Sequence, residues 1–143
     1  MTQVTSRDLG AVLTRVAFGA MLLSHGLLKV VVFTIPGTVG FFESQGFPGF
    51  MAYPVILGEI IGGIAIMLGL YTRLAALLSI PILLGAVLVH AGNGWLFTNT
   101  GGGWEYPAFL IFIAVNITLH GDGIFAIRKL PLIDAYIPPI LKA

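Results

Sequence analysis

Several ionisable side chains in this chain fall inside stretches that are otherwise apolar. Only 9% of the 143 residues are charged, yet Arg15, His25, Lys29 and Glu59 each lie within a long apolar run. A charge at the centre of a bilayer costs about 2.5 to 3.5 kcal/mol on insertion scales. Side chains kept at that cost pair with one another, move protons or bind ligands. We therefore take these four residues as the start of a candidate site.

Two of the buried groups have side chains suited to proton transfer. Glu59 and His25 are the candidate catalytic residues, because a carboxylate and an imidazole can each act as a general acid or base. Lys29 could pair with Glu59, or it could donate a hydrogen bond to a carbonyl or anionic oxygen of a ligand. The candidate substrate-binding residues are Arg15, Lys29, His90, Trp104 and Glu105. Four of them, Lys29, His90, Trp104 and Glu105, lie near predicted helix ends, where anchoring at the membrane surface is an equally good explanation.

The sequence offers no redox cofactor site of its own. Cysteine is absent, which excludes disulfides, thiolate zinc sites and cysteine-ligated iron–sulfur clusters. No H-x-H or HExxH spacing occurs, so we expect no metal site. His25 and His90 are predicted at depths about 10 Å apart at the helical rise, which does not favour a haem held by both. The cofactor is therefore left unassigned.

Four apolar segments must carry these residues. The chain is 57% apolar with a mean hydropathy of +1.01, which is outside the range of soluble domains. A helix needs about 20 mostly apolar residues to cross a bilayer. We predict an all-α membrane protein, a single domain over residues 1–143 with four transmembrane helices at about 9–33, 53–70, 74–91 and 105–120. The net charge of +1 and the lack of a Lys/Arg run argue against a nucleic-acid partner.

The two long connections between the predicted spans contain Glu43 as their one charged residue. Residues 34–52 contain four phenylalanines and several glycines and prolines, and they predict a loop at the membrane interface or over the mouth of the bundle. Residues 92–103 are rich in glycine and asparagine and predict a second loop. The tail, residues 124–143, is too short and too rich in proline to span, so we expect it to lie along the interface.

Basic residues predict the orientation of the spans. The connections after the first and third spans contain no Lys or Arg, whereas Arg7, Arg73, Arg128, Lys129 and Lys142 all fall on the other side. The positive-inside rule then places both termini in the cytoplasm. In that orientation the outer half of the bilayer holds His25, Lys29, Glu59, His90 and Glu105.

Two sequence patterns predict which helix faces are buried. Arg15, His25 and Lys29 lie within about 80° of each other at 100° per residue, so they form one polar stripe that we expect to face the bundle. On the second span, small residues recur at the spacing of a close helix–helix contact. That predicted packing seam consists of Gly58, Gly62, Ala65 and Gly69.

The order and spacing of these elements resemble the DoxX family. The resemblance rests on Arg15, Ser24-His25-Gly26 with Lys29, Gly58-Glu59 with Gly62-Gly63, the turn Leu68–Arg73, His90, Gly103–Tyr106 and the closing Gly121 and Gly123. It covers roughly residues 15–123 and implies a multi-pass protein of the bacterial inner membrane with four helices. Some family members are membrane subunits of oxidoreductases, including enzymes that couple the oxidation of thiosulfate to quinone. Asp122, between the closing glycines, departs from the family pattern.

Two functions fit these observations. The first is a membrane subunit of a redox system that binds a quinone or similar small molecule in the outer half of the bundle and receives electrons from an oxidoreductase partner. The second is a non-enzymatic binding, transport or assembly protein that uses the same polar cluster. The lipid bilayer is a partner in both, and a homo-oligomer is compatible with both.

Overall fold

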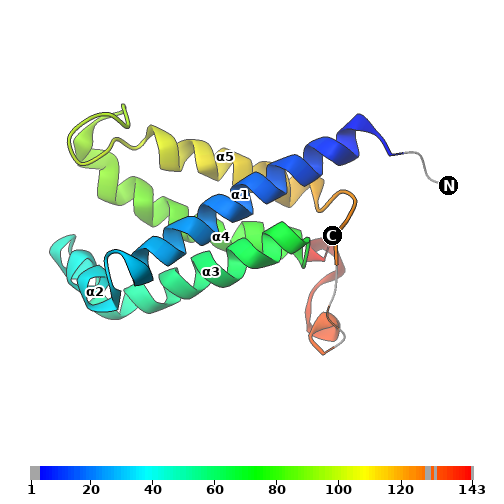
Figure 1. Ribbon diagram of the computed structural model, residues 1–143, viewed down its shortest axis with the longest axis horizontal. Helices are drawn as coiled ribbons and strands as arrows, with labels where there is room; N and C mark the ends of the chain where they lie inside the picture. Colours follow the sequence, from blue (N-terminus) through cyan, green and yellow to red (C-terminus); the bar gives the residue numbers. More distant parts are fainter. Residues whose placement is uncertain (1–3, 128–129, 131, 143) are drawn as a thin grey trace.

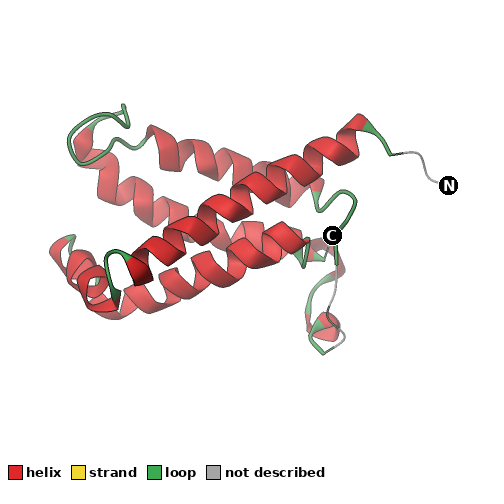
Figure 2. Ribbon diagram, viewed as in Figure 1, coloured by secondary structure: helices red, strands yellow, loops and turns green. Residues whose placement is uncertain are grey.

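The structure is a computed structural model that describes residues 4–127, 130 and 132–142. These residues form helices, turns and loops without any strand (Figure 2). The α-helices are α1 (Ser6–Val31), α2 (Ile35–Ser44), α3 (Ala52–Leu68), α4 (Thr72–His90) and α5 (Glu105–His120). Short 3-10 turns follow or precede them, namely η1 (Gly49–Met51), η2 (Ala91–Asn93), η3 (Asp134–Tyr136) and η4 (Pro139–Leu141).

Four of the helices lie alongside one another to form the bundle. Figure 1 shows α1, α3, α4 and α5 running along the long axis, with α2 and residues 91–104 at one end. The start of α1, the turn between α3 and α4 and the end of α5 lie at the opposite end. We call the first of these the α2 end. We call the second the Arg15 end, because the buried side chain of Arg15 lies near it.

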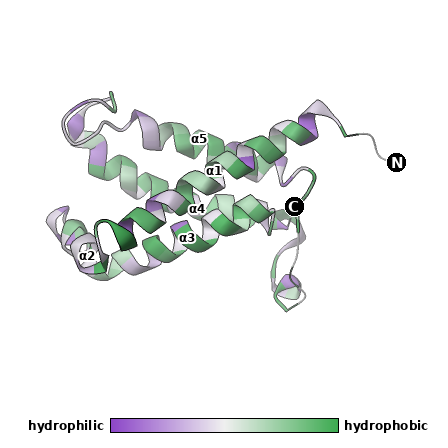
Figure 3. Ribbon diagram, in the orientation of Figure 1, coloured by the Kyte–Doolittle hydropathy of each residue, from purple (hydrophilic) through white to green (hydrophobic). Residues whose placement is uncertain are grey.

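The bundle has the dimensions and surface of a membrane protein. Three helical segments are long and apolar enough to cross a bilayer, Ser6–Val31, Gly49–Leu68 and Thr72–Asn93, while α5 is a shorter apolar helix. Large apolar side chains point outward along them, including Leu13, Leu88 and Phe112, and the apolar colour covers most of each helix in Figure 3. Such a surface is stable against lipid chains and not against water. The structure therefore agrees with the predicted all-α membrane bundle.

The helix boundaries follow from local chemistry. Thr5 and Asp8 form a reciprocal capping box, in which each side chain accepts a hydrogen bond from the other residue's backbone N–H, and this box begins α1. Gly69 ends α3 in the left-handed conformation at φ = +70°, where a side chain would be strained. Pro81 lies inside α4, where it cannot donate the usual backbone hydrogen bond.

The predicted loop between the first two spans is wrong over residues 35–44, which form α2. Thr34 caps this helix by accepting a hydrogen bond from the backbone N–H of Gly37, and Pro36 occupies its first turn, where the missing N–H costs nothing. The Thr38 hydroxyl donates to the carbonyl oxygen of Lys29 at 2.8 Å and so ties α2 to α1. The glycines and prolines of this segment predict a loop from the sequence. In the structure they lie within and beside a short helix.

The predicted packing seam is wrong at Gly62, whereas Gly58 and Gly69 do lie in close contacts. A Cβ atom built on Gly62 meets nothing within 4 Å, so this glycine is not in a close contact. A Cβ on Gly63 would lie 2.7 Å from the carbonyl oxygen of Gly19 and 2.7 Å from the backbone N of Leu23. The backbones of α1 and α3 therefore cross at Gly19 and Gly63, as small residues allow in membrane bundles. α3 does contact α1 through a small residue, but the packing of α1 determines which face of α3 makes the contact.

The core holds all four long helices together. Its buried apolar members are Phe18, Leu22, Ile66, Ala76, Leu83, Leu110, Ala114 and Ile117. In a bilayer these contacts stabilise through van der Waals packing, because lipid chains are as apolar as the core itself.

The tail docks on the Arg15 end through polar contacts. The Tyr71 hydroxyl donates to the carbonyl oxygen of Leu130 at 3.1 Å, and Arg73 donates to the carbonyl of Ile140 at 3.3 Å. Lys142 and Asp134 form an ion pair at 2.9 Å. Arg128 and Lys129, on which part of the predicted orientation rests, lie outside the described residues.

The glycine contact gives a matched test of the fold. We expect Gly63→Ala to destabilise the bundle by about 1 to 3 kcal/mol, because the new methyl group meets backbone atoms that cannot move aside easily. Gly62→Ala should be neutral or slightly stabilising, since the space is open and alanine favours helix more than glycine does. Unfolding of both purified variants in one detergent would measure the difference. An equal loss in both would show that α1 and α3 do not cross at Gly63.

Candidate functional site

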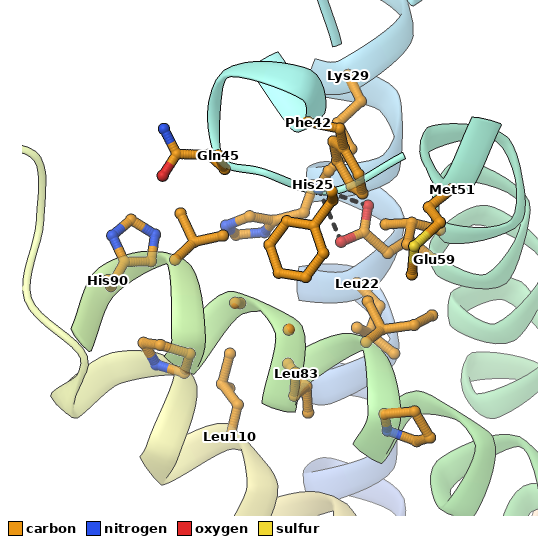
Figure 4. A pocket seen from close by; sticks show the side chains of 18 of the residues that line it. Leu22, His25, Lys29, Phe42, Gln45, Met51, Glu59, Leu83, His90 and Leu110 are labelled. Carbon is orange, nitrogen blue, oxygen red and sulfur yellow. Dashed lines mark hydrogen bonds and ion pairs between the residues drawn. The ribbon is translucent and has the colours of Figure 1, made fainter. Parts of the chain in front are cut away.

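A cavity of about 250 Å³ opens at the α2 end between the long helices. Its walls are mostly apolar and come from every α-helix, with α2 supplying Phe41 and Phe42 and α4 supplying the stretch around Pro81 and Gly85. Figure 4 shows His25, Lys29, Glu59 and His90 among the side chains that line it. Four of the seven residues singled out from the sequence are therefore on one cavity.

Lys29 and Glu59 form an ion pair on the wall of this cavity. Nζ of Lys29 donates to Oε1 of Glu59 at 2.8 Å and to Oε2 at 2.7 Å, so both carboxylate oxygens face the same cation. Glu59 is only 6% exposed. The pair offsets the cost of placing two charges inside the bundle. It joins α1 to α3 near Gly26, where a Cβ atom would lie 3.1 Å from Cβ of Glu59.

His25 lies one helical turn before Lys29 and is held by its own helix. Its Nδ1 is 2.9 Å from the carbonyl oxygen of Met21, one turn earlier in α1. The ring also packs near Tyr106 of α5, with 6.3 Å between ring centroids. No described residue forms a hydrogen bond with the other ring nitrogen, Nε2, so it is left to interact with a molecule in the cavity.

His90 lies at the edge of the cavity and holds the loop that follows it. Its Nδ1 is 3.0 Å from the carbonyl oxygen of Gly101 and 3.1 Å from that of Gly102. The Asn93 side chain donates to the same two oxygens. His90 therefore both lines the cavity and fixes the backbone at its rim.

Trp104 and Glu105 do not line this cavity. Glu105 accepts a hydrogen bond from the backbone N–H of Phe97 at 2.8 Å, and Trp104 packs edge-on against Trp95 with 4.5 Å between ring centroids. Both interactions fold residues 91–104 onto the start of α5. Glu105 belongs instead to a shallow hollow beside the cavity, which shares Tyr106 with it.

Arg15 is buried at the opposite end of the bundle. It is 2% exposed, and Nη2 donates to the carbonyl oxygens of Ile124 at 3.1 Å and Phe125 at 2.6 Å. Asp122 is buried and close enough to interact with it electrostatically. Ten residues of helix separate Arg15 from His25, about 15 Å at the helical rise, so the predicted polar stripe faces the bundle at two separate places.

Several cavity residues were not singled out from the sequence. Phe41, Phe42 and Gln45 come from α2 or its end, a segment for which the sequence predicts a loop. Tyr106 follows Glu105 directly, and its position on the inner side of α5 depends on how that helix is rotated. Among the described residues, no group of three histidines, aspartates or glutamates could hold a metal ion.

The fold and the cavity define a class: a small membrane-embedded helical bundle with a buried Lys–Glu pair and histidine on one internal site. The DoxX family model matches residues 10–92, and the chain belongs to this family. It is 33% identical to a Bacillus subtilis (strain 168) protein named "Putative oxidoreductase CatD" over 122 residues, which cover 85% of this chain and 87% of that protein.

A second relative is itself named as a membrane protein. Over 133 residues the chain is 36% identical to "Inner membrane protein YqjF" of Escherichia coli (strain K12), with 86% of this chain and 92% of that protein covered. No solved structure matches this chain. The findings together make this chain a membrane protein of the DoxX family, and YqjF supports an inner-membrane location.

The ion pair predicts a coupled effect on stability. Lys29→Met leaves Glu59 buried without its cation, and we expect a loss of about 3 to 5 kcal/mol in the free energy of unfolding. The double variant Lys29→Met with Glu59→Leu should recover most of that loss, because no unpaired charge remains. The comparison is made by unfolding the purified proteins in detergent.

The half-buried pair between Lys142 and Asp134, which is more exposed than Lys29 and Glu59, is the control. Its two side chains are 29% and 25% exposed, so Lys142→Met should cost less than about 1 kcal/mol. A double variant no more stable than Lys29→Met alone would contradict the assignment of Lys29 and Glu59 as a mutually dependent pair.

Proposed function

We propose that this chain is the integral membrane subunit of a redox system and that its cavity binds a quinone or a similar small molecule. The observation that carries the proposal is the placement of His25 beside the Lys29–Glu59 pair on an otherwise apolar cavity. Apolar walls with a few polar groups are typical of sites for small aromatic molecules. The name of the B. subtilis relative, "Putative oxidoreductase CatD", supports the same class.

In this proposal the chain handles the ligand and its protons, and a partner protein supplies the electrons. Reduction of a quinone consumes two electrons and two protons. The chain contains no cysteine, and no nucleotide-binding motif was found in it, so the electrons are assigned to an oxidoreductase partner. His25 and Glu59 are the proposed proton carriers because both lie on the cavity wall, next to the Lys29 ammonium, and both have side chains suited to acid–base chemistry.

The remaining candidates take different roles in the proposal. Lys29 and His90 line the cavity, so we assign them to ligand binding. Arg15, Trp104 and Glu105 hold backbone elsewhere, so we assign them to positioning the tail and the loop that surround the site.

We also propose that α5 is the fourth span and that both termini are cytoplasmic. α5 runs from the α2 end to the Arg15 end beside the three longer helices (Figure 1). Arg7 and Arg73 belong to the Arg15 end, whereas residues 32–51 and 91–104 contain no Lys or Arg. The positive-inside rule then places the Arg15 end in the cytoplasm and the cavity in the outer half of the membrane. In this arrangement the tail lies along the cytoplasmic interface.

The orientation can be tested with single cysteines, because the natural chain has none. We expect Gln45→Cys and Thr98→Cys to react with a membrane-impermeant maleimide on intact cells, since both side chains are exposed at the α2 end. Ala135→Cys, exposed in the tail, should react only after the cells are opened. Labelling of Ala135→Cys on intact cells would reverse the orientation and move the cavity to the inner half.

Ligand binding can be tested by filling the cavity. Gly85 lines it, and a Cβ atom there meets nothing within 4 Å, so Gly85→Leu should fold while occupying the space of the ligand. We expect this variant to lose saturable binding of trimethyl-1,4-benzoquinone, measured by calorimetry on protein in lipid nanodiscs. Gly62→Leu is the control, because it adds the same side chain in open space away from the cavity. Unchanged binding in Gly85→Leu would remove the quinone from this cavity.

The same preparation separates a proton-handling role of Glu59 from a structural one. Glu59→Gln keeps the shape of the side chain but cannot exchange a proton, so it should bind the quinone and lose its enzymatic reduction in the presence of the partner. Glu59→Asp should keep part of the activity. Full activity in Glu59→Gln would leave Glu59 as the structural partner of Lys29. If the wild type binds no quinone at all, a non-enzymatic role in binding, transport or assembly takes precedence.

A further inference from the structure

The hydrogen bond of His25 determines which of its ring nitrogens carries the hydrogen. Nδ1 lies 2.9 Å from the carbonyl oxygen of Met21. A carbonyl oxygen can only accept a hydrogen bond, so Nδ1 must be the donor. In the neutral ring Nε2 then carries no hydrogen and presents a lone pair. Toward a molecule in the cavity, neutral His25 is therefore a hydrogen-bond acceptor.

His90 has the same polarity at the edge of the cavity. Its Nδ1 faces the carbonyl oxygens of Gly101 and Gly102 at 3.0 and 3.1 Å, so this nitrogen is also a donor to backbone. The Nε2 atom of the neutral ring is again an acceptor. Figure 4 shows the two rings on the cavity wall, on α1 and α4. Both cavity histidines therefore match a ligand that brings its own hydroxyl hydrogens.

The charged groups on the wall, Lys29 and Glu59, do not reverse the preference of the two histidines for a ligand with hydroxyl hydrogens. Lys29 directs two of its three ammonium hydrogens to Glu59, whose two oxygens both face that cation. The third hydrogen can be donated to a ligand oxygen whether that oxygen is a carbonyl or a hydroxyl, because both accept. Lys29 thus helps to bind either form of a quinone, and the histidines distinguish between them.

We propose that the cavity selects the reduced, hydroxyl-bearing form of its quinone ligand, a hydroquinone whose O–H donates a hydrogen bond to Nε2 of His25. This inference rests on the proposed function, because it assumes that a quinone occupies the cavity. A quinone presents only carbonyl oxygens, and one of them would face the lone pair of His25 without a hydrogen between them. A site with a buried acceptor discriminates against a ligand that leaves the acceptor unpaired.

Such a preference has a direct consequence for electron flow. A site that binds the reduced form about tenfold more tightly raises the reduction potential of the bound couple by about 30 mV for a two-electron step. The bound quinone then accepts electrons more readily than the free quinone. The polarity of His25 thus fits a site at which a partner delivers electrons to the quinone.

The binding test uses three compounds of nearly equal size: trimethylhydroquinone, trimethyl-1,4-benzoquinone and the dimethyl ether of the hydroquinone. Affinities are measured without oxygen at pH 7.5 on wild-type protein in nanodiscs, with empty nanodiscs subtracted. We expect the hydroquinone to bind about tenfold more tightly than the other two, corresponding to one hydrogen bond whose absence leaves a buried acceptor unpaired. Equal affinities for hydroquinone and quinone, or for hydroquinone and its ether, would overturn the inference while leaving quinone binding intact.

His25→Asn is the matched variant. The amide N–H₂ of asparagine can take the place of Nδ1 and donate to the Met21 carbonyl, but nothing replaces Nε2. We expect the tenfold preference to fall to about one, through weaker binding of the hydroquinone and little change for the quinone. His120→Asn is the control, because His120 is exposed at the far end of α5 and should keep the preference. A preference that survives in His25→Asn would assign it to another group.

The tautomer itself can be read without any ligand. The chain has only three histidines, so ¹⁵N-histidine solid-state NMR on the protein in lipid, with the His25→Asn spectrum for assignment, identifies His25. We expect a neutral ring protonated on Nδ1 at pH 7.5. A ring protonated on Nε2, or on both nitrogens, would overturn the inference even if quinone binding is found. If none of the three compounds binds saturably, the proposed function fails and this inference fails with it.

Discussion

The Lys29–Glu59 ion pair is the interaction on which the α2 end of this bundle depends. A carboxylate at 6% exposure inside a membrane bundle needs a cation, and Lys29 supplies two hydrogen bonds under 3 Å. The pair can form only because α1 and α3 approach closely, with Gly26 beside it and the Gly19–Gly63 crossing two turns further along. The glycines and the buried charges therefore act together. The glycines let the backbones of α1 and α3 approach each other, and the ion pair favours the one alignment of these helices in which Lys29 meets Glu59.

The two ends of the bundle treat their buried polar groups differently. At the Arg15 end, Arg15 donates to backbone carbonyls after α5, and Tyr71 and Arg73 bind the tail, so polar groups close the structure. At the α2 end, His25 uses one nitrogen for backbone and keeps the other for the cavity. Polar side chains that form hydrogen bonds with the backbone stabilise the fold. A side chain that also has a hydrogen-bonding atom facing a cavity can recognise a ligand.

The rim of the cavity is built by residues that resemble ligand-binding groups in the sequence. His90 and Asn93 both bind the carbonyls of Gly101 and Gly102, and Glu105 accepts from the backbone of Phe97. These contacts fix an uncharged, glycine-rich segment in which the regular structure is limited to the 3-10 turn η2. α2 completes the rim from the other side with Phe41 and Phe42. The cavity is thus enclosed by two connecting segments, each anchored by a few hydrogen bonds.

Composition and periodicity determined that this chain is an all-helical membrane protein, because long apolar runs have few other stable states in lipid. They also singled out Glu59 and Lys29, because a charged residue within an apolar run can be recognised from the sequence alone. They placed His25 in the outer half of the membrane and Arg15 outside it, but they could not predict the partner of Arg15, because its hydrogen bonds go to the backbone after α5. They placed the glycine contact at Gly62 instead of Gly63, because a single helix offers several small faces and its neighbour selects one. The α2 helix and the partners of His90 and Glu105 were likewise decided only by the packed structure, since their hydrogen bonds join segments whose proximity no local pattern records.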